Sequence, residues 1–151
     1  MWSGNPQNPY NRDRSIAPAA LAPLQSVPGL AFYSLQKGEA APVAASQPAP
    51  ISLIDLTGHE RDFLDTVAFI SQLDLVISVD TMIANLAGAM GARVWVLLNR
   101  VPDWRHHLER SDNPWYPTMR LYRQTREGEW GEVVDRVASD LRSLSAAIGG
   151  A

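Results

Sequence analysis

Short apolar runs alternate with amphipathic segments along this chain. The runs are rich in Val, Ile, Leu and aromatic residues, as expected for strands that are covered on both faces. They predict strands at residues 30–35, 51–56, 75–79, 93–98 and 119–123. Strands that alternate with helical segments are typical of a parallel sheet with right-handed crossovers. The pattern therefore predicts an α/β fold, with a Rossmann-like parallel sheet flanked by helices.

Apolar residues at helical spacing predict the helices that cover this sheet. Ser15 is expected to cap a short helix near Pro18, and Asp62 or Asp65 to cap the next one. Trp130 begins the final helix. Its apolar stripe, which predicts core packing, contains Val133, Val134, Val137, Leu141 and Leu144.

The stretch from Leu75 to Gly91 combines a buried strand, a sharp turn and a helix. Its small residues, which let the helix pack closely, are Ala84, Ala87, Gly88 and Ala89. The turn contains Asp80 and Thr81, which are both good N-cap types. A strand that feeds a helix in this way places free N–H groups and a positive dipole at the sheet's carboxyl edge, where α/β proteins bind phosphates.

Irregular segments separate these elements. Residues 1–14 read as a polar loop, residues 39–50 as an Ala- and Pro-rich loop, and residues 99–118 as a long loop of the kind that is often functional. Only residues 1–3 remain of a first strand, which is central in doubly wound sheets. We therefore expect a stub or a second chain at this position, and self-association through exposed apolar surface.

Composition narrows the classes of function. The length of 151 residues fits a single domain, residues 1–151, and 46% hydrophobic with 19% charged residues describes a globular protein. A formal net charge of −3 disfavours nucleic-acid binding. The chain has no cysteine, no run long enough to span a membrane and no signal-peptide pattern, so we expect a cytoplasmic protein.

Several segments together indicate a family. DFLDTVAFISQLDLVISVDTMIANLAGAMGARVWVLL, PDWR and SDNPWYPTMRLYRQ, with the opening WSGNPQNPYNRDRSI, resemble the C-terminal half of glycosyltransferase family 9-like proteins. These are heptosyltransferase-related enzymes that are often fused to tetratricopeptide repeats in bacteria. The resemblance covers nearly the whole chain in the right order. It implies the C-terminal, donor-binding half of a GT-B glycosyltransferase.

Such an enzyme transfers a hexosyl or heptosyl group from a nucleotide-diphosphate-sugar with inversion, and without a metal or another cofactor. The N-terminal acceptor domain, which usually supplies the catalytic base, would be a missing domain or a partner chain. This chain alone is therefore expected to be inactive, and its catalytic residues are unknown. Without a metal, amides, a helix N-terminus and arginines must stabilise the leaving diphosphate.

The resemblance assigns donor contacts to particular residues. The phosphate-binding turn and helix would contribute Asp80, Thr81, Met82, Ile83 and Asn85, and the opening loop would contribute Asn5 and Arg14, or Arg12 in its place. Asp80 repels phosphate, so it would cap the helix or contact a sugar hydroxyl. The base and ribose would lie near Ser34 and Gln36. The loop over the donor would contain Asp103, Trp104 and Arg105.

Two positions depart from the family pattern. The related turn commonly has glycine and histidine where this chain has Met82 and Asn85. They favour an alternative, in which the chain is a degenerate, non-catalytic binding or interaction module. A free-nucleotide binder is a weaker idea, because the G-x-G-x-x-G fingerprint is missing.

Other residues in the long loop have structural interpretations. His106 and His107 lack further ligands at metal spacing, so we predict no metal site there. Trp115 and Tyr116 are expected to anchor the loop to the domain, because prolines on both sides stiffen it.

Overall fold

The computed structural model of the chain describes residues 1–41 and 51–149. Most of the predicted loop at residues 39–50 lies outside this description. So does Gly150, which with Gly149 was expected to end the last helix. The statements below concern the described residues.

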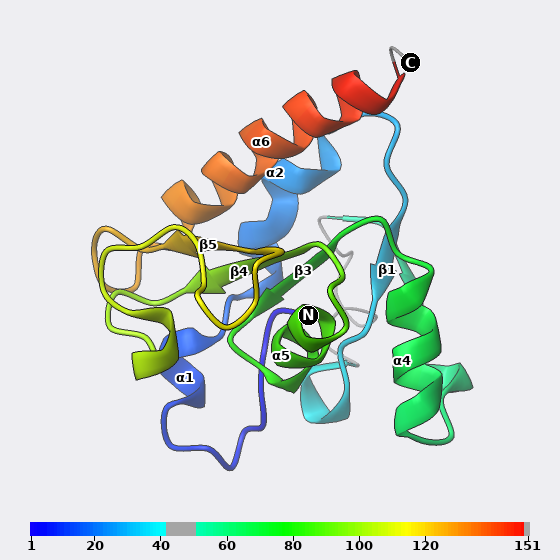
Figure 1. Ribbon diagram of the computed structural model, residues 1–151, viewed down its shortest axis with the longest axis horizontal. Helices are drawn as coiled ribbons and strands as arrows, with labels where there is room; N and C mark the ends of the chain where they lie inside the picture. The colour runs from blue at the N-terminus through cyan, green and yellow to red at the C-terminus, as the bar shows by residue number, and fades with distance from the viewer. Residues whose placement is uncertain (42–50, 150–151) are drawn as a thin grey trace.

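Five short strands form two parallel sheets (Figure 1). The larger sheet has the order β3 (Val76–Val79), β4 (Val94–Leu98) and β5 (Met119–Arg123). A separate pair joins β1 (Phe32–Ser34) to β2 (Leu53–Asp55). All five strands lie within the predicted runs, and the parallel pairing is confirmed.

Helices flank the larger sheet on both faces (Figure 1). They are α2 (Ala22–Gln25), α4 (Phe63–Ser71), α5 (Met82–Ala89) and α6 (Gly131–Gly149), whereas the single turn α1 (Asn11–Arg14) has no buried residue and belongs to neither core. Short 3₁₀ turns are η1 (Pro18–Leu21), η2 (Gly38–Ala40), η3 (Thr57–His59) and η4 (Trp104–His106). None of these helices is long and apolar enough to cross a membrane.

Strand β4 separates two hydrophobic cores. Trp95 and Leu97 face α2 and α6, whereas Val94, Val96 and Leu98 face α5 and α4. Every residue of β4 is buried, because both faces of the strand are covered. The predicted stripe of α6 is confirmed: its valines and Leu141 are buried in the first core, and Leu144 packs against it.

The helix starts agree with the sequence in part. Asp62 caps α4, because its carboxylate accepts hydrogen bonds from the N–H groups of Leu64 and Asp65. The prediction that Ser15 caps a helix is wrong. Its hydroxyl donates instead to the carbonyl of Asn11, 2.6 Å away, and so ends α1, the single helical turn in the predicted opening loop.

Met1 occupies the place of a first strand beside β3. Its amino group donates to the carbonyl of Ile77 at 2.9 Å, and its carbonyl accepts from the N–H of Val79 at 3.1 Å. This is the bonding pattern of a residue in a parallel strand opposite Ser78. The expected stub is therefore present, and it consists of one residue.

Close packing against α5 depends on Gly88. A Cβ atom at this position would lie 2.6 Å from Cγ of Tyr116, which is far too close. The expected close approach to this helix is therefore confirmed, and Tyr116 from the long loop makes it.

We predict that Gly88→Ala lowers the free energy of unfolding by about 1 to 3 kcal/mol, because the ring of Tyr116 must move. At an exposed position in a helix, Gly→Ala raises the free energy of unfolding by about 1 kcal/mol, so a decrease at Gly88 indicates the contact with Tyr116. Urea unfolding measures it, with Gly58→Ala as the control, since a Cβ there meets nothing within 4 Å. Unchanged or increased stability of Gly88→Ala would refute the packing argument.

The buried amine of Met1 should make stability depend on pH. Burial lowers the pKa of this amino group from 8.0 to about 5. Between these values the unfolded chain holds the proton and the folded chain does not, so stability should fall as the pH is lowered from 8 towards 5. Amino-terminal acetylation should remove this component in urea titrations. Identical pH dependence of the free and acetylated proteins would contradict the assignment.

Candidate functional site

A cleft of about 860 Å³ opens at the carboxyl ends of β3 and β4. Its walls come from the loop around α1, the turn after β3, the loop after β4 and the loop before α6. The first and third of these loops lie side by side (Figure 1). This is the edge of a parallel sheet where α/β proteins bind ligands, and the volume suits a molecule of nucleotide size.

Three arginines of the cleft have no carboxylate partner among the described residues. Arg12, Arg14 and Arg100 all line the cleft, and no ion pair joins them to an acidic side chain there. The Nε atom of Arg14 is buried and has no hydrogen-bond partner. A buried guanidinium nitrogen is costly to leave unpaired, so Arg14 has a hydrogen-bond donor that the described residues do not satisfy.

Arg123 adds to the positive charge behind the cleft. Burial lowers the pKa of its guanidinium, and the nearby charge of Arg100 lowers it further. One of its terminal nitrogens donates to the carbonyl of His106 at 3.1 Å, and the other is buried without a partner. An anion in the cleft would offset this repulsion.

Four acidic residues line the cleft; Arg105 lies against two of them, Asp80 and Asp103, whereas Asp13 and Glu127 form no ion pair with it. Its Nε donates to Asp103 at 2.7 Å, which raises the pKa of Arg105 and lowers that of Asp103. Its other nitrogens lie 3.9 Å from Asp80 and 3.3 Å from the side-chain oxygen of Asn85, to which Nη1 donates. Arg105 thus ties the loop after β4 to the start of α5.

A buried His106 also contacts Asp80. Nε2 of the ring lies 3.2 Å from the carboxylate, and Nδ1 lies 3.1 Å from the side-chain nitrogen of Asn113. The oxygen of Asn113 accepts from the N–H groups of Trp115 and Tyr116, so its nitrogen is the donor to Nδ1. Nε2 therefore carries the proton, and it lies near the Asp80 carboxylate without a hydrogen bond of good geometry to it.

Sequence reasoning gave His106 a structural interpretation without a partner, and it did not consider Asn113. Adjacent histidines in a loop have no periodicity that shows which one is buried, and Asn113 contacts the ring only after the loop has folded. Among the described residues, no three His, Asp or Glu side chains gather in a way that could hold a metal ion.

The start of α5 differs from the predicted cap. Asp80 does not cap the helix, because its carboxylate faces Arg105 and His106. Thr81 stands at the cap position, but its hydroxyl lies 2.9 Å from that of Ser78 and makes no capping bond. The N–H groups of Met82 and Ile83 open the helix and have no acceptor within it. Apart from Asp80, these predicted residues do not line the cleft.

Gln36 and Ser34 lie away from the cleft. The side chain of Gln36 is fully buried, and its oxygen accepts from the N–H groups of Trp2 and Ser3, both at 3.0 Å. Its nitrogen donates to the carbonyls of Ser3 and Lys37. Ser34 accepts from the N–H of Gln36. The structure therefore does not bring the predicted base and ribose contacts to the cleft. Gln36 instead holds Trp2 and Ser3 against the end of β1 through hydrogen bonds.

The remaining predicted residues divide between the cleft and the surface. Asp103 and Arg105 line the cleft, whereas exposed Asn5 and Trp104 do not. The expectation that Trp115 is a buried anchor is wrong: it is 60% exposed and packs edge-on against Trp104.

Fold and site together define a mixed α/β protein. Its parallel sheets are flanked by helices, which is compatible with a Rossmann-like domain that has an arginine-lined cleft at its carboxyl edge. The chain is similar to Protein FlbA of Caulobacter vibrioides, with 31% identity over 154 residues. The match covers 97% of this chain and 25% of FlbA, so the chain spans about a quarter of the length of that relative. No protein-family model and no solved structure matches the chain.

We predict that Gln36→Ala destabilises the protein by about 2 to 5 kcal/mol, because the buried N–H groups of Trp2 and Ser3 lose their acceptor. Exposed Gln7→Ala is the matched control. Chemical unfolding measures both variants. Equal free energies of unfolding for the Gln36→Ala and Gln7→Ala variants would contradict the structural role of Gln36.

Proposed function

We propose that this chain is the donor-binding domain of an inverting, metal-independent GT-B glycosyltransferase. The ligand of the cleft would be a nucleotide-diphosphate-sugar. The proposal combines the family resemblance of the sequence with the position and charge of the cleft. The single observation that carries it is the set of Arg12, Arg14 and Arg100, which face the cleft without carboxylate partners among the described residues.

The chemistry of the proposed reaction requires such a set. The leaving nucleoside diphosphate gains negative charge as the glycosidic bond breaks, and preorganised donors lower the barrier by stabilising that charge. Arg14, with its unpaired Nε, would contact the diphosphate. The open N–H groups of Met82 and Ile83 are the nearest helix N-terminus to Asp80, and they would support a phosphate that reaches past this residue.

Asp80 would have a positioning role in this scheme. Its contacts with His106 and Arg105 hold the carboxylate at the cleft wall, where it would accept a hydrogen bond from a sugar hydroxyl. The acceptor site and the catalytic base would come from the N-terminal domain of a GT-B enzyme, present in another part of the protein or in a partner chain. The proposed activity therefore requires that second domain.

One observation favours the alternative of a non-catalytic module. Arg105 donates to Asn85 and lies near Asp80, so the polar groups at the start of α5 already have partners inside the protein. In a degenerate domain these contacts would close the turn to ligands. One result distinguishes the two functions. In a degenerate module only the Asn85→His variant should bind a nucleotide, whereas in a functional donor domain the unaltered chain should already bind it.

We expect calorimetric titration with a panel of nucleoside diphosphates and nucleotide sugars to detect binding, and Arg14→Gln to weaken it about tenfold or more. One charge-assisted hydrogen bond contributes about 1.5 to 3 kcal/mol, which corresponds to that factor. Arg61→Gln is the charge-matched control, because this side chain is 88% exposed and does not line the cleft.

Absence of binding by every nucleotide would overturn the proposal. So would an equal loss in the Arg14→Gln and Arg61→Gln variants, since a nonspecific charge effect would explain it.

A further inference from the structure

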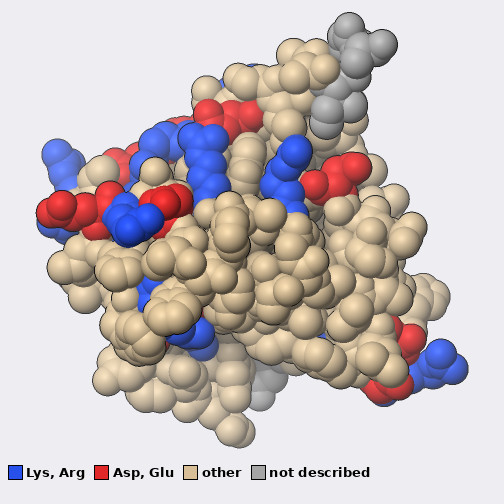
Figure 2. Space-filling model, viewed as in Figure 1, with Lys and Arg blue, Asp and Glu red and all other residues tan. Residues whose placement is uncertain are grey.

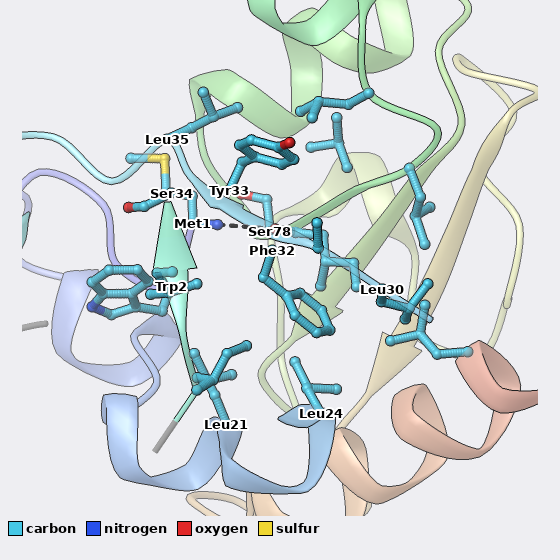
Figure 3. A pocket seen from close by; sticks show the side chains of 18 of the residues that line it. Met1, Trp2, Leu21, Leu24, Leu30, Phe32, Tyr33, Ser34, Leu35 and Ser78 are labelled. Carbon is cyan, nitrogen blue, oxygen red and sulfur yellow. Dashed lines mark hydrogen bonds between the residues drawn. The ribbon is translucent and has the colours of Figure 1, made fainter. Parts of the chain in front are cut away.

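An apolar slot of about 460 Å³ separates the two sheets. Residues 29–35 of the β1 region border it on one side, and residues 72–79 of the β3 region border it on the other. Figure 3 looks into this slot, with Met1 and Trp2 at one end and Leu21, Leu24 and Leu30 towards the other. The slot has the position of a strand between β1 and β3.

The backbone on both sides of the slot is oriented to pair with a strand. In β3, the N–H of Val76 donates to Arg93 in the β4 direction, so the neighbouring Ile77 turns its N–H towards the slot. In β1, the carbonyl of Ser34 accepts from Leu56 in the β2 direction, so Tyr33 turns its N–H towards the slot. No backbone ladder joins β1 to β3 in the described part of the chain.

Met1 shows the direction of the strand that fits. Its hydrogen bonds with Ile77 and Val79 give it the register of a strand parallel to β3. Its amino group is buried at the end of the slot, where a charged amine is costly and a peptide N–H is not (Figure 3). A strand that continues backward from Met1 therefore enters the slot without a change of direction.

We propose that the slot is a strand-acceptor site, occupied by an extended apolar polypeptide segment that is joined to the nitrogen of Met1 and runs parallel to β1 and β3. About five residues would fill it. Because both faces of such a strand would be covered, its side chains would be Val, Ile or Leu. The strand would unite the two sheets in the order β2, β1, added strand, β3, β4, β5.

This order agrees with the topology that the sequence predicts. It is the 3-2-1-4-5-6 order of a doubly wound dinucleotide-type sheet, with the added segment as the first strand. The loop that follows this strand would be residues 4–14, which carry Arg12 and Arg14 to the cleft. A strand in the slot would therefore hold the start of residues 4–14, the loop that carries Arg12 and Arg14, more rigidly. The slot proposal does not depend on what the cleft binds.

The experiment compares the 151-residue chain with versions that carry a six-residue extension before Met1. One extension is apolar and β-forming, a second is the same sequence with a central proline, and a third is Gly/Ser-rich. Amide hydrogen exchange at Tyr33 and Ile77 is the main readout, with Val96 in the existing ladder as the internal control.

The apolar extension should slow exchange at Tyr33 and Ile77 about tenfold or more and should raise the urea concentration at the midpoint of unfolding. The proline and Gly/Ser extensions should do neither, because proline removes a ladder hydrogen bond.

Three outcomes would overturn the proposal. Exchange at Tyr33 and Ile77 that is unchanged by the apolar extension would show that the slot does not accept the strand. Equal protection by a free peptide of the same sequence would show that the site takes a separate chain. Protection in the unextended protein together with a dimer mass by light scattering would show that a second copy fills the slot.

Discussion

The parallel ladder through β4 is the constraint on which the rest of the structure depends. Every side chain of this strand is buried, so both faces of the sheet must be covered, α6 on one side and α5 on the other. Parallel pairing then brings the carboxyl ends of β3, β4 and β5 to one edge. Asp80, Arg100 and Arg123 meet near that edge because each follows or ends a strand of this ladder.

The cleft and the slot are the two features that this ladder leaves open, and the first residues of the chain connect them. Met1 extends the ladder beyond β3, and Gln36 holds the next two residues against the end of β1. The chain then turns into the loop that carries Arg14 to the cleft. Figure 2 shows few charged side chains over α5, whereas charged side chains gather near β5 and α6 and also beside α4 at the right-hand edge of the view.

Much of the fold follows from local patterns in the sequence. The β-branched runs locate all five strands because a strand covered on both faces must be apolar throughout. The stripe of α6 follows from helical periodicity, and the α4 cap follows from the side chain of Asp62. The short helical segment expected near Pro18 is present as η1 and α2, but its predicted cap is wrong, since Ser15 bonds backward to Asn11.

The site was less predictable because its contacts span long distances in the chain. Gln36 reaches Trp2 and Ser3 across more than thirty residues, and His106 meets Asp80 only when the long loop folds over β3. No local pattern encodes such contacts. The family resemblance of the sequence did point to Arg14, Asp103 and Arg105, which all line the cleft.

The central claim is that unpaired guanidinium groups at this edge bind a diphosphate. Its most direct test is a ¹H–¹⁵N NMR titration of the protein with inorganic pyrophosphate, which follows arginine Nε–H and backbone N–H signals together. The account predicts the largest shifts at the Nε–H of Arg14, with smaller saturable shifts at the amides of Met82 and Ile83. Saturable shifts elsewhere that leave the Arg14 signal unmoved would contradict it.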